Sequence, residues 1–229
     1  AVRALRSARG EQPVGFKIGF TNRTIWQRYR VFAPIWGTVW NTTLHFCEGR
    51  GAVALRALCQ PRLEPEVVFG IRATPPADAS LEQLFDCVEW LAPGFEVVQS
   101  HCADWVFTAA RTVADGGLHG RLLVGAKTAV RELAGSGEAL DATFAACSVR
   151  LVRDGALVEQ GHGCHVLDGP LHALRHFVLE LQRCPGAPAP RPGDVVTTGT
   201  WTDAWPVGPG QAWRAEFDAP VASLEVALR

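Results

Sequence analysis

The stretch RLEPEVVFG, from Arg62 to Gly70, most limits what this chain can fold into. Its apolar residues are typical of a buried strand, yet it carries two acids, Glu64 and Glu66. Side chains two residues apart on a strand point to the same face, so the two carboxylates are expected side by side. Burial disfavours the ionised form of a carboxyl group, and like charges at short range repel each other. The fold must therefore supply either solvent or a compensating charge at this face.

A divalent cation would supply that charge. Carboxylate oxygens suit hard ions such as Mg²⁺, Mn²⁺ or Ca²⁺, which would cancel the repulsion and replace the lost water. A third acid, Glu96, lies in a second strand-like run, GFEVVQS, and would extend the ligand set. The alternative is that all three acids face solvent on a half-exposed sheet. The pattern alone leaves both interpretations open.

Lys17 is the second candidate for chemistry. The run PVGFKIGF alternates as a strand does, and it places Lys17 opposite Phe16 and Ile18, with a glycine two residues away on each side. Apolar neighbours lower the pKa of a lysine, so Lys17 could act as an acid or base or could hold an anionic substrate. The alternative is a solvated lysine on an edge strand.

Predicted strands outnumber predicted helices and do not alternate with them regularly, which indicates an α+β fold, or a mostly β fold with helices packed outside. Ser80 and Gln83 form a capping-box pattern, Asp154-Gly155 predicts a hairpin, and Pro170 suits a first helical turn. Pro34–Gly37 and 184–194 are expected to be loops. Strands are predicted over 13–20, 53–58, 62–70, 94–100, 121–126, on either side of 154–155, and over 194–200, 211–218 and 222–228. Helices are predicted over 22–30, 80–91, 103–114 and 170–181.

Composition excludes several classes of partner. The formal net charge is −1, and the tryptophans are not interleaved with a basic patch, which argues against nucleic acid. No apolar run is long enough for a membrane span, and no signal peptide is apparent. Seven widely spaced cysteines predict free thiols in a reducing, cytoplasmic compartment. The histidines are weaker candidates: His172 and His176 lack the acid of an HExxH site, whereas His119 could line a site.

Several stretches together resemble one known family, the 2-keto-4-pentenoate hydratases, which belong with the 4-oxalocrotonate decarboxylases to the fumarylacetoacetate hydrolase superfamily. The resemblance runs from about Val14 to Leu228, in the order found in that family. The stretches that carry it are GFKIGFTN, QPRLEPEVVFG, EWLAPGFEVVQSHCADW, TVADGG and PGDVVTTGT.

The resemblance implies one catalytic domain over 1–229, a mixed β-roll with flanking helices, in which the family's N-terminal helical segment has no counterpart. It implies Mg²⁺ or Mn²⁺ held by Glu64, Glu66 and Glu96, with Lys17 as the catalytic residue. Thr200 falls in a segment near the substrate. The implied activity is a hydro-lyase of aromatic catabolism that hydrates a 2-hydroxy-2,4-dienoate to a 4-hydroxy-2-oxo acid. The alternatives are a 2-oxo acid decarboxylase of the 4-oxalocrotonate type and an acylpyruvate hydrolase.

Two departures from the family pattern bear on the reaction. The hydratases usually carry an acid near the PxxG turn, where this chain has Ile35 and Trp36. They also tend to read DTVADNAS, whereas this chain reads RTVADGGLHG, which brings in His119 as a further candidate for substrate binding. The family tends to form homo-oligomers, and its hydratases and decarboxylases can associate. A non-catalytic partner subunit is therefore a further alternative.

Overall fold

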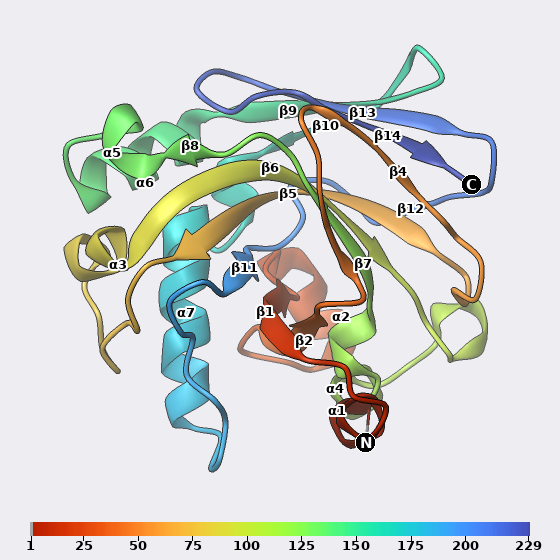
Figure 1. Ribbon diagram of the computed structural model, residues 1–229, viewed down its shortest axis with the longest axis horizontal. Helices are drawn as coiled ribbons and strands as arrows, with labels where there is room; N and C mark the ends of the chain where they lie inside the picture. Colours follow the sequence, from red (N-terminus) through yellow and green to blue (C-terminus); the bar gives the residue numbers. More distant parts are fainter. Residues whose placement is uncertain (1) are drawn as a thin grey trace.

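The computed structural model describes residues 2–229 and contains two curved sheets with helices packed around them (Figure 1). The larger sheet has nine strands, in the order β2-β1-β11-β5-β6-β7-β3, with β12 beside β5 and β8 beside β6. The smaller sheet has five strands, in the order β10-β9-β13-β14-β4. The predicted α+β class is confirmed.

The strands vary widely in length, and β5 and β6 are the two longest. Their bounds are β1 Pro13–Gly19, β2 Ile35–Trp40, β3 Leu44–Phe46, β4 Arg50–Val53, β5 Arg62–Ile71, β6 Val88–Val98, β7 His119–Val124, β8 Thr128–Ala129, β9 Ser148–Arg153, β10 Ala156–His162, β11 Val195–Thr197, β12 Trp205–Pro206, β13 Ala212–Phe217 and β14 Leu224–Leu228.

The helices are short apart from α6 and α7. The α-helices are α1 Val2–Ala8, α2 Trp26–Tyr29, α3 Leu81–Cys87, α4 Ala109–Ala114, α5 Val130–Leu133, α6 Gly137–Ala146 and α7 Pro170–Gln182. The 3₁₀ turns are η1 Arg23–Ile25, η2 Ala103–Trp105, η3 Gly116–Leu118 and η4 Gly163–His165. None of the described helices combines the length and the apolar character that crossing a membrane requires.

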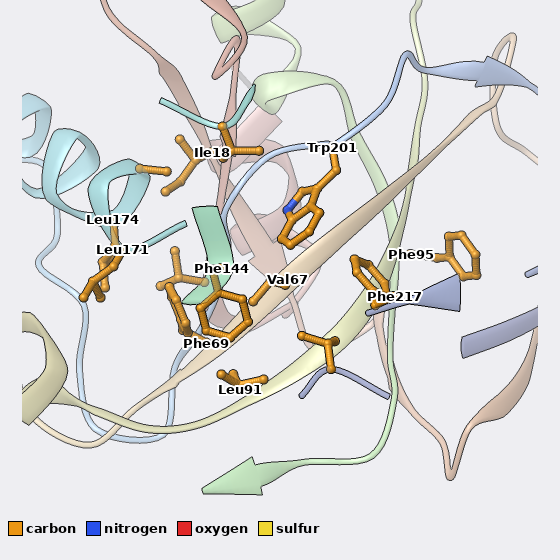
Figure 2. Close-up of a cluster of buried hydrophobic side chains, with 14 of the residues drawn as sticks. Ile18, Val67, Phe69, Leu91, Phe95, Phe144, Leu171, Leu174, Trp201 and Phe217 are labelled. Carbon is orange, nitrogen blue, oxygen red and sulfur yellow. The ribbon is translucent and has the colours of Figure 1, made fainter. Parts of the chain in front are cut away.

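The long strands β5 and β6 pair along their whole length and form an arch, with the smaller sheet on one side and β1, β2 and α7 on the other (Figure 1). Odd-numbered residues of β5 enter the main core. In Figure 2, Val67 and Phe69 of β5 lie in one cluster with Phe144 of α6 and with Leu171 and Leu174 of α7. Burying this apolar surface stabilises the fold by roughly 25 cal/mol per Å². The even-numbered residues of β5 are left to face the opposite side of the strand.

The helix predicted over 80–91 is too long. Its start is as predicted, because Ser80 and Gln83 form the capping box, but α3 ends at Cys87 and β6 begins at the next residue. Val88 to Leu91 follow helical spacing, yet they pair with the end of β5, and this tertiary pairing overrides a local preference. Pro93 lies inside β6, opposite Val67.

Other segments also differ from the prediction. The helix expected over 103–114 is divided into η2 and α4, because Asp104 and Trp105 adopt positive φ. Residues 35–37 belong to β2, which pairs with β1. The strand expected over 53–58 is β4, which ends at Val53, and helix α6 was not predicted.

The hairpin at Asp154-Gly155 is confirmed, with both φ angles positive as a type I′ turn requires. All seven cysteines are free.

Candidate metal centre

Cross-strand pairing gathers the three acids. Glu64 of β5 lies directly opposite Glu96 of β6, and Glu66 is two residues along β5 on the same face. One oxygen from each carboxylate lies within 4.8 Å of the others. Glu66 and Glu96 are completely buried, at 0% exposure, and Glu64 is partly buried. The alternative of acids facing solvent is therefore wrong for Glu66 and Glu96.

The hydrogen bonds of Glu66 show whether this cluster suits a cation. Its Oε2 accepts a hydrogen bond of 2.7 Å from the backbone N–H of Gly199, but its buried Oε1 has no partner among the described residues. A buried carboxylate oxygen without a partner is unfavourable, and coordination to a cation would compensate for it. An all-carboxylate set with open space beside it matches the hard ions Mg²⁺, Mn²⁺ and Ca²⁺. These residues fit the predicted metal.

Lys17 of β1 reaches the same cluster. It is 3% exposed, and its Nζ lies 3.0 Å from Glu96 Oε2, which excludes the alternative of a solvated edge lysine. Burial lowers the pKa of Lys17, but Glu96, Glu64 and Glu66 together outweigh burial and raise it above its usual value. The expectation that apolar neighbours favour the neutral amine is thus reversed in the cation-free cluster. A bound divalent cation would oppose these carboxylates and favour proton release from Nζ.

The three carboxyl groups differ in their readiness to ionise. Burial raises the pKa of Glu64 to about 7, with Lys17 opposing the shift and Glu96 adding to it. Burial also raises the pKa of Glu66 well above its usual value, helped by Glu96 and Glu64. Burial acts in the same direction on Glu96, but Lys17 and His119 outweigh it and lower its pKa. Glu96 is therefore the member of the cluster that ionises most readily.

These shifts predict how the stability of the cation-free protein depends on pH. The folded-state pKa values of Glu64 and Glu66 exceed the ordinary value of 4.5, so the folded state keeps protons that the unfolded chain releases. His119 and His176, whose pKa burial lowers from 6.5, act in the opposite direction up to about that pH. Above pH 6.5 the free energy of unfolding should therefore fall as pH rises through about 7. Thermal unfolding in EDTA from pH 6.5 to pH 8 checks this. Added Mg²⁺ should raise the midpoint most at pH 8, where protons compete least with the cation. A midpoint in EDTA that rises over this range would contradict the prediction.

His119, the first residue of β7, forms a hydrogen bond with Glu96. Its Nδ1 lies 2.7 Å from Glu96 Oε1, and its Nε2 lies 2.8 Å from Thr43 Oγ1. An ionised carboxylate only accepts hydrogen bonds, so Nδ1 must carry a proton and donate it. Such a partner fixes the orientation of a metal-ligating side chain. His119 is buried and does not line the cavity described next, which differs from the expected contact with substrate.

A cavity of about 260 Å³ opens beside Lys17 and Glu64. Thr200, in the loop after β11, lines it, and its hydroxyl donates to the carbonyl of Thr202. Sequence reasoning missed most of the remaining wall. The missed residues are an aromatic group, Phe20, Tyr29, Trp105 and Phe107, and two arginines, Arg28 and Arg62. In the sequence, only Arg62 could have been predicted to lie near the site, because it precedes Glu64 by two residues and so shares its strand face.

No protein-family model matches the chain. It is 28% identical to a 2-keto-4-pentenoate hydratase from Burkholderia vietnamiensis over 196 residues, which are 85% of this chain and 70% of that protein. It is also 28% identical to a 4-oxalocrotonate decarboxylase from a Pseudomonas species over 218 residues, which are 93% of this chain and 78% of that protein. This chain is a relative of these hydratases and decarboxylases. The predicted resemblance is confirmed.

Solved structures of two related enzymes have the same fold as this chain. A 4-oxalocrotonate decarboxylase from Pseudomonas putida G7, complexed with magnesium and adipate, matches with a TM-score of 0.86 at 23% identity, covering 100% of this chain and 82% of that one. A fumarylpyruvate hydrolase from Pseudomonas aeruginosa, in complex with Mn²⁺ and pyruvate, matches with a TM-score of 0.70 at 16% identity, covering 93% and 88%. The predicted fumarylacetoacetate hydrolase type of fold is confirmed.

This chain has a close-packed, apolar wall at the two places where its sequence departs from the pattern of the hydratases. A Cβ added to Gly37 of β2 would lie 2.0 Å from the carbonyl oxygen of Gly116, so only glycine lets β2 and η3 approach this closely. Gly117 lies against the stem of Lys17, where a Cβ would be 3.1 Å from the lysine Cδ. Ile35 and Leu118 line the cavity on this side. The wall beside Lys17 is therefore apolar.

Proposed function

We propose that this chain is a divalent-metal-dependent lyase of small 2-oxo acids, which hydrates a 2-hydroxy-2,4-dienoate to a 4-hydroxy-2-oxo acid. One observation carries the proposal. Three convergent carboxylates, one with an unpartnered buried oxygen, lie against Lys17 at the base of a cavity. The relatives named as hydratases and as a decarboxylase support the same class of reaction.

Glu64, Glu66 and Glu96 would hold Mg²⁺ or Mn²⁺. The bound ion supplies Lewis acidity that polarises a 2-oxo group and stabilises its enolate. Lys17 Nζ is the proton-carrying group at the base of the cavity, and we assign to it the transfer of protons to and from the substrate carbons. The dienol loses its hydroxyl proton and gains one at carbon 5. Water then adds its oxygen at carbon 4 and a proton at carbon 3, which completes a net hydration.

Other residues of the chain would have supporting roles. Thr200 lines the cavity, and we assign it a contact with the substrate. His119 holds Glu96 in place through its Nδ1 hydrogen bond. We further infer a cytoplasmic homo-oligomer. The seven free cysteines suit a reducing compartment, and the exposed side chains of Phe32 and Val106, at 86% and 74%, suit a subunit contact.

The apolar wall favours a second candidate reaction, the decarboxylation of a 2-oxo acid. Among the described residues, Glu64 and Asp203 are the only acids that line the cavity, and Ile35 and Leu118 lie beside Lys17. Few groups there could activate a water molecule. Loss of CO₂ produces the same enolate as the hydration route and needs no activated water. Hydrolysis of an acylpyruvate would need an activated water as hydration does.

Separate product assays distinguish these reactions. The Mg²⁺-loaded protein is expected to consume 2-hydroxypenta-2,4-dienoate or its 5-carboxylate analogue, and the loss of dienol absorbance measures this consumption. CO₂ from 2-oxohex-3-enedioate and pyruvate from an acylpyruvate are measured alongside. Activity that appears only after a related hydratase or decarboxylase is added would identify a partner subunit. The absence of any turnover, with or without such a partner, would contradict the proposed activity.

A further inference from the structure

The turn that follows β2 holds a buried hydroxyl group beside His119. Thr43, at 1% exposure, donates its backbone N–H to the carbonyl of Trp40 at 2.9 Å, and its Oγ1 accepts the N–H of Trp40 at 3.1 Å. The carbonyl of Thr43 accepts the N–H of Leu122 in β7 at 2.8 Å. These bonds fix the Thr43 side chain relative to β7, on which His119 precedes Leu122 by three residues. The Thr43 hydroxyl is thereby placed 2.8 Å from His119 Nε2.

The partners of this hydroxyl group determine which nitrogen of His119 carries the proton. A hydroxyl group has one proton to donate, and Thr43 Oγ1 already accepts the Trp40 N–H. Its proton can go to His119 Nε2, at 2.8 Å, or to the Trp40 carbonyl, at 3.0 Å. That carbonyl already accepts the Thr43 backbone N–H, whereas Nε2 has no other partner among residues 2–229. The hydroxyl therefore donates to Nε2, which leaves the imidazole proton on Nδ1, facing Glu96.

Glu96 consequently has one oxygen held by the protein and one left for a ligand. His119 Nδ1 lies 2.7 Å from Oε1, while Oε2 has only the Lys17 ammonium group close to it, at 3.0 Å. Glu66 shows the same division, since the Gly199 N–H donates to its Oε2, and its Oε1 has no partner in the described part of the chain. Neither carboxylate can offer both oxygens to a cation without losing a hydrogen bond. The two buried ligands are therefore restricted to one oxygen each.

Carboxylates restricted in this way distinguish between hard cations. Ca²⁺ takes roughly six to eight oxygens in a flexible geometry and often binds both oxygens of a carboxylate, whereas Mg²⁺ takes about six and needs only one from each carboxylate. We propose that Thr43 is a positioning residue of the metal centre: by fixing the tautomer of His119, it confines Glu96 to one ligand oxygen, which favours Mg²⁺ over Ca²⁺. This inference rests on the proposed function, which places the cation between the three carboxylates.

Substitutions that remove or keep the hydroxyl group of Thr43 test this role. Thr43→Val keeps the branched shape without the hydroxyl, so the imidazole proton of His119 is free to move from Nδ1 to Nε2. Calorimetric titration is expected to show a loss of Mg²⁺ affinity of about 10-fold or more, since residues that support metal ligands contribute about 10- to 100-fold. The loss of Ca²⁺ affinity should be smaller, because Ca²⁺ accepts a reoriented or two-oxygen carboxylate. Thr43→Ser should keep both affinities, and a loss in this variant equal to that in Thr43→Val would overturn the role of the hydroxyl.

Thr42→Val is the matched control, because Thr42 is exposed and its hydroxyl donates to Glu11, outside the metal centre. It should leave both affinities unchanged. His119→Asn separates the two steps, since an asparagine amide can donate to Glu96 from the position of Nδ1 without help from Thr43. In that background, Thr43→Val should have little further effect on Mg²⁺ affinity. Fully additive losses would show that Thr43 does not act through His119 and would overturn the inference.

The tautomer can also be measured in the unmodified protein, which decides the matter should Thr43→Val fold poorly. Nitrogen-15 NMR of the cation-free protein should show a proton on His119 Nδ1 alone, in the signal that His119→Asn removes. A proton on Nε2 would overturn the role of Thr43. Equal losses of Mg²⁺ and Ca²⁺ affinity in Thr43→Val, or no loss, would overturn the selection of Mg²⁺ and leave the proposed function standing. If the unmodified protein binds neither cation, the proposed function fails, and this inference fails with it.

Discussion

Replacing Glu66 with glutamine is expected to weaken Mg²⁺ binding by more than about 100-fold, since even residues that only support metal ligands contribute 10- to 100-fold. Glu66 is completely buried, and its Oε1 has no partner among residues 2–229. The substitution removes the charge and keeps the shape. The cation-free variant should unfold at the same temperature as the parent protein or higher, because burial opposes ionisation of Glu66. Metal titration and thermal unfolding in EDTA measure the two effects separately.

Glu48→Gln is the matched control for this substitution, because Glu48 is exposed and lies outside the cluster. It should change neither metal affinity nor stability. An unchanged Mg²⁺ titration in Glu66→Gln would remove Glu66 from the ligand set. A variant that loses both metal binding and its folded structure would show instead that the carboxylate is needed for the fold, which its raised pKa argues against.

Replacing Lys17 with alanine is expected to lower turnover by about 10²- to 10⁴-fold, the usual contribution of a positioned acid or base. Metal binding should respond in the opposite direction. Lys17 Nζ lies 3.0 Å from Glu96 Oε2 and competes with a cation for that oxygen, so its removal should leave Mg²⁺ affinity unchanged or increase it. Turnover measured at saturating Mg²⁺, together with a separate metal titration, separates the two effects.

The chain contains only one other lysine, Lys127, which makes a natural control. Its Nζ lies 4.5 Å from the ring centre of Trp90 and it does not line the cavity. Lys127→Ala should therefore keep full activity. Full activity in Lys17→Ala would remove Lys17 from the mechanism. A parallel loss of metal affinity would show that Lys17 acts by holding Glu96 in position.

The carboxylate cluster could be predicted from the sequence because strand alternation is local. Glu64 and Glu66 share a face whatever the rest of the chain does, and the apolar residues around them indicated burial. That Glu96 faces Glu64 depends on the register between β5 and β6, which no local pattern contains. The contact of Lys17 with Glu96 is still less local, because β1 reaches β5 only through β11, near the end of the chain. The family resemblance, rather than periodicity, placed these residues in one site.

The wrong predictions also arise from contacts between segments far apart in the sequence. The spacing of Leu84, Val88 and Leu91 is that of a continuous helix, but pairing with β5 begins at Val88 and makes this segment a strand. His119 was expected at the substrate because its neighbours depart from the family pattern. It lies behind Glu96 instead, since the pairing of β6 with β7 fixes its distance from that carboxylate. The aromatic wall comes from loops and 3₁₀ turns, whose packing has no periodic signal.

The central claim is that Glu64, Glu66 and Glu96 hold a divalent cation at the base of the cavity and that a 2-oxo acid binds to it beside Lys17. A crystal structure of the protein with Mn²⁺ and pyruvate, read from the anomalous signal of the metal, tests this most directly. The account predicts one strong peak in contact with an oxygen of each of the three carboxylates and with two oxygens of pyruvate. A structure in which these carboxylates bind no ion, or in which pyruvate binds elsewhere, would contradict it.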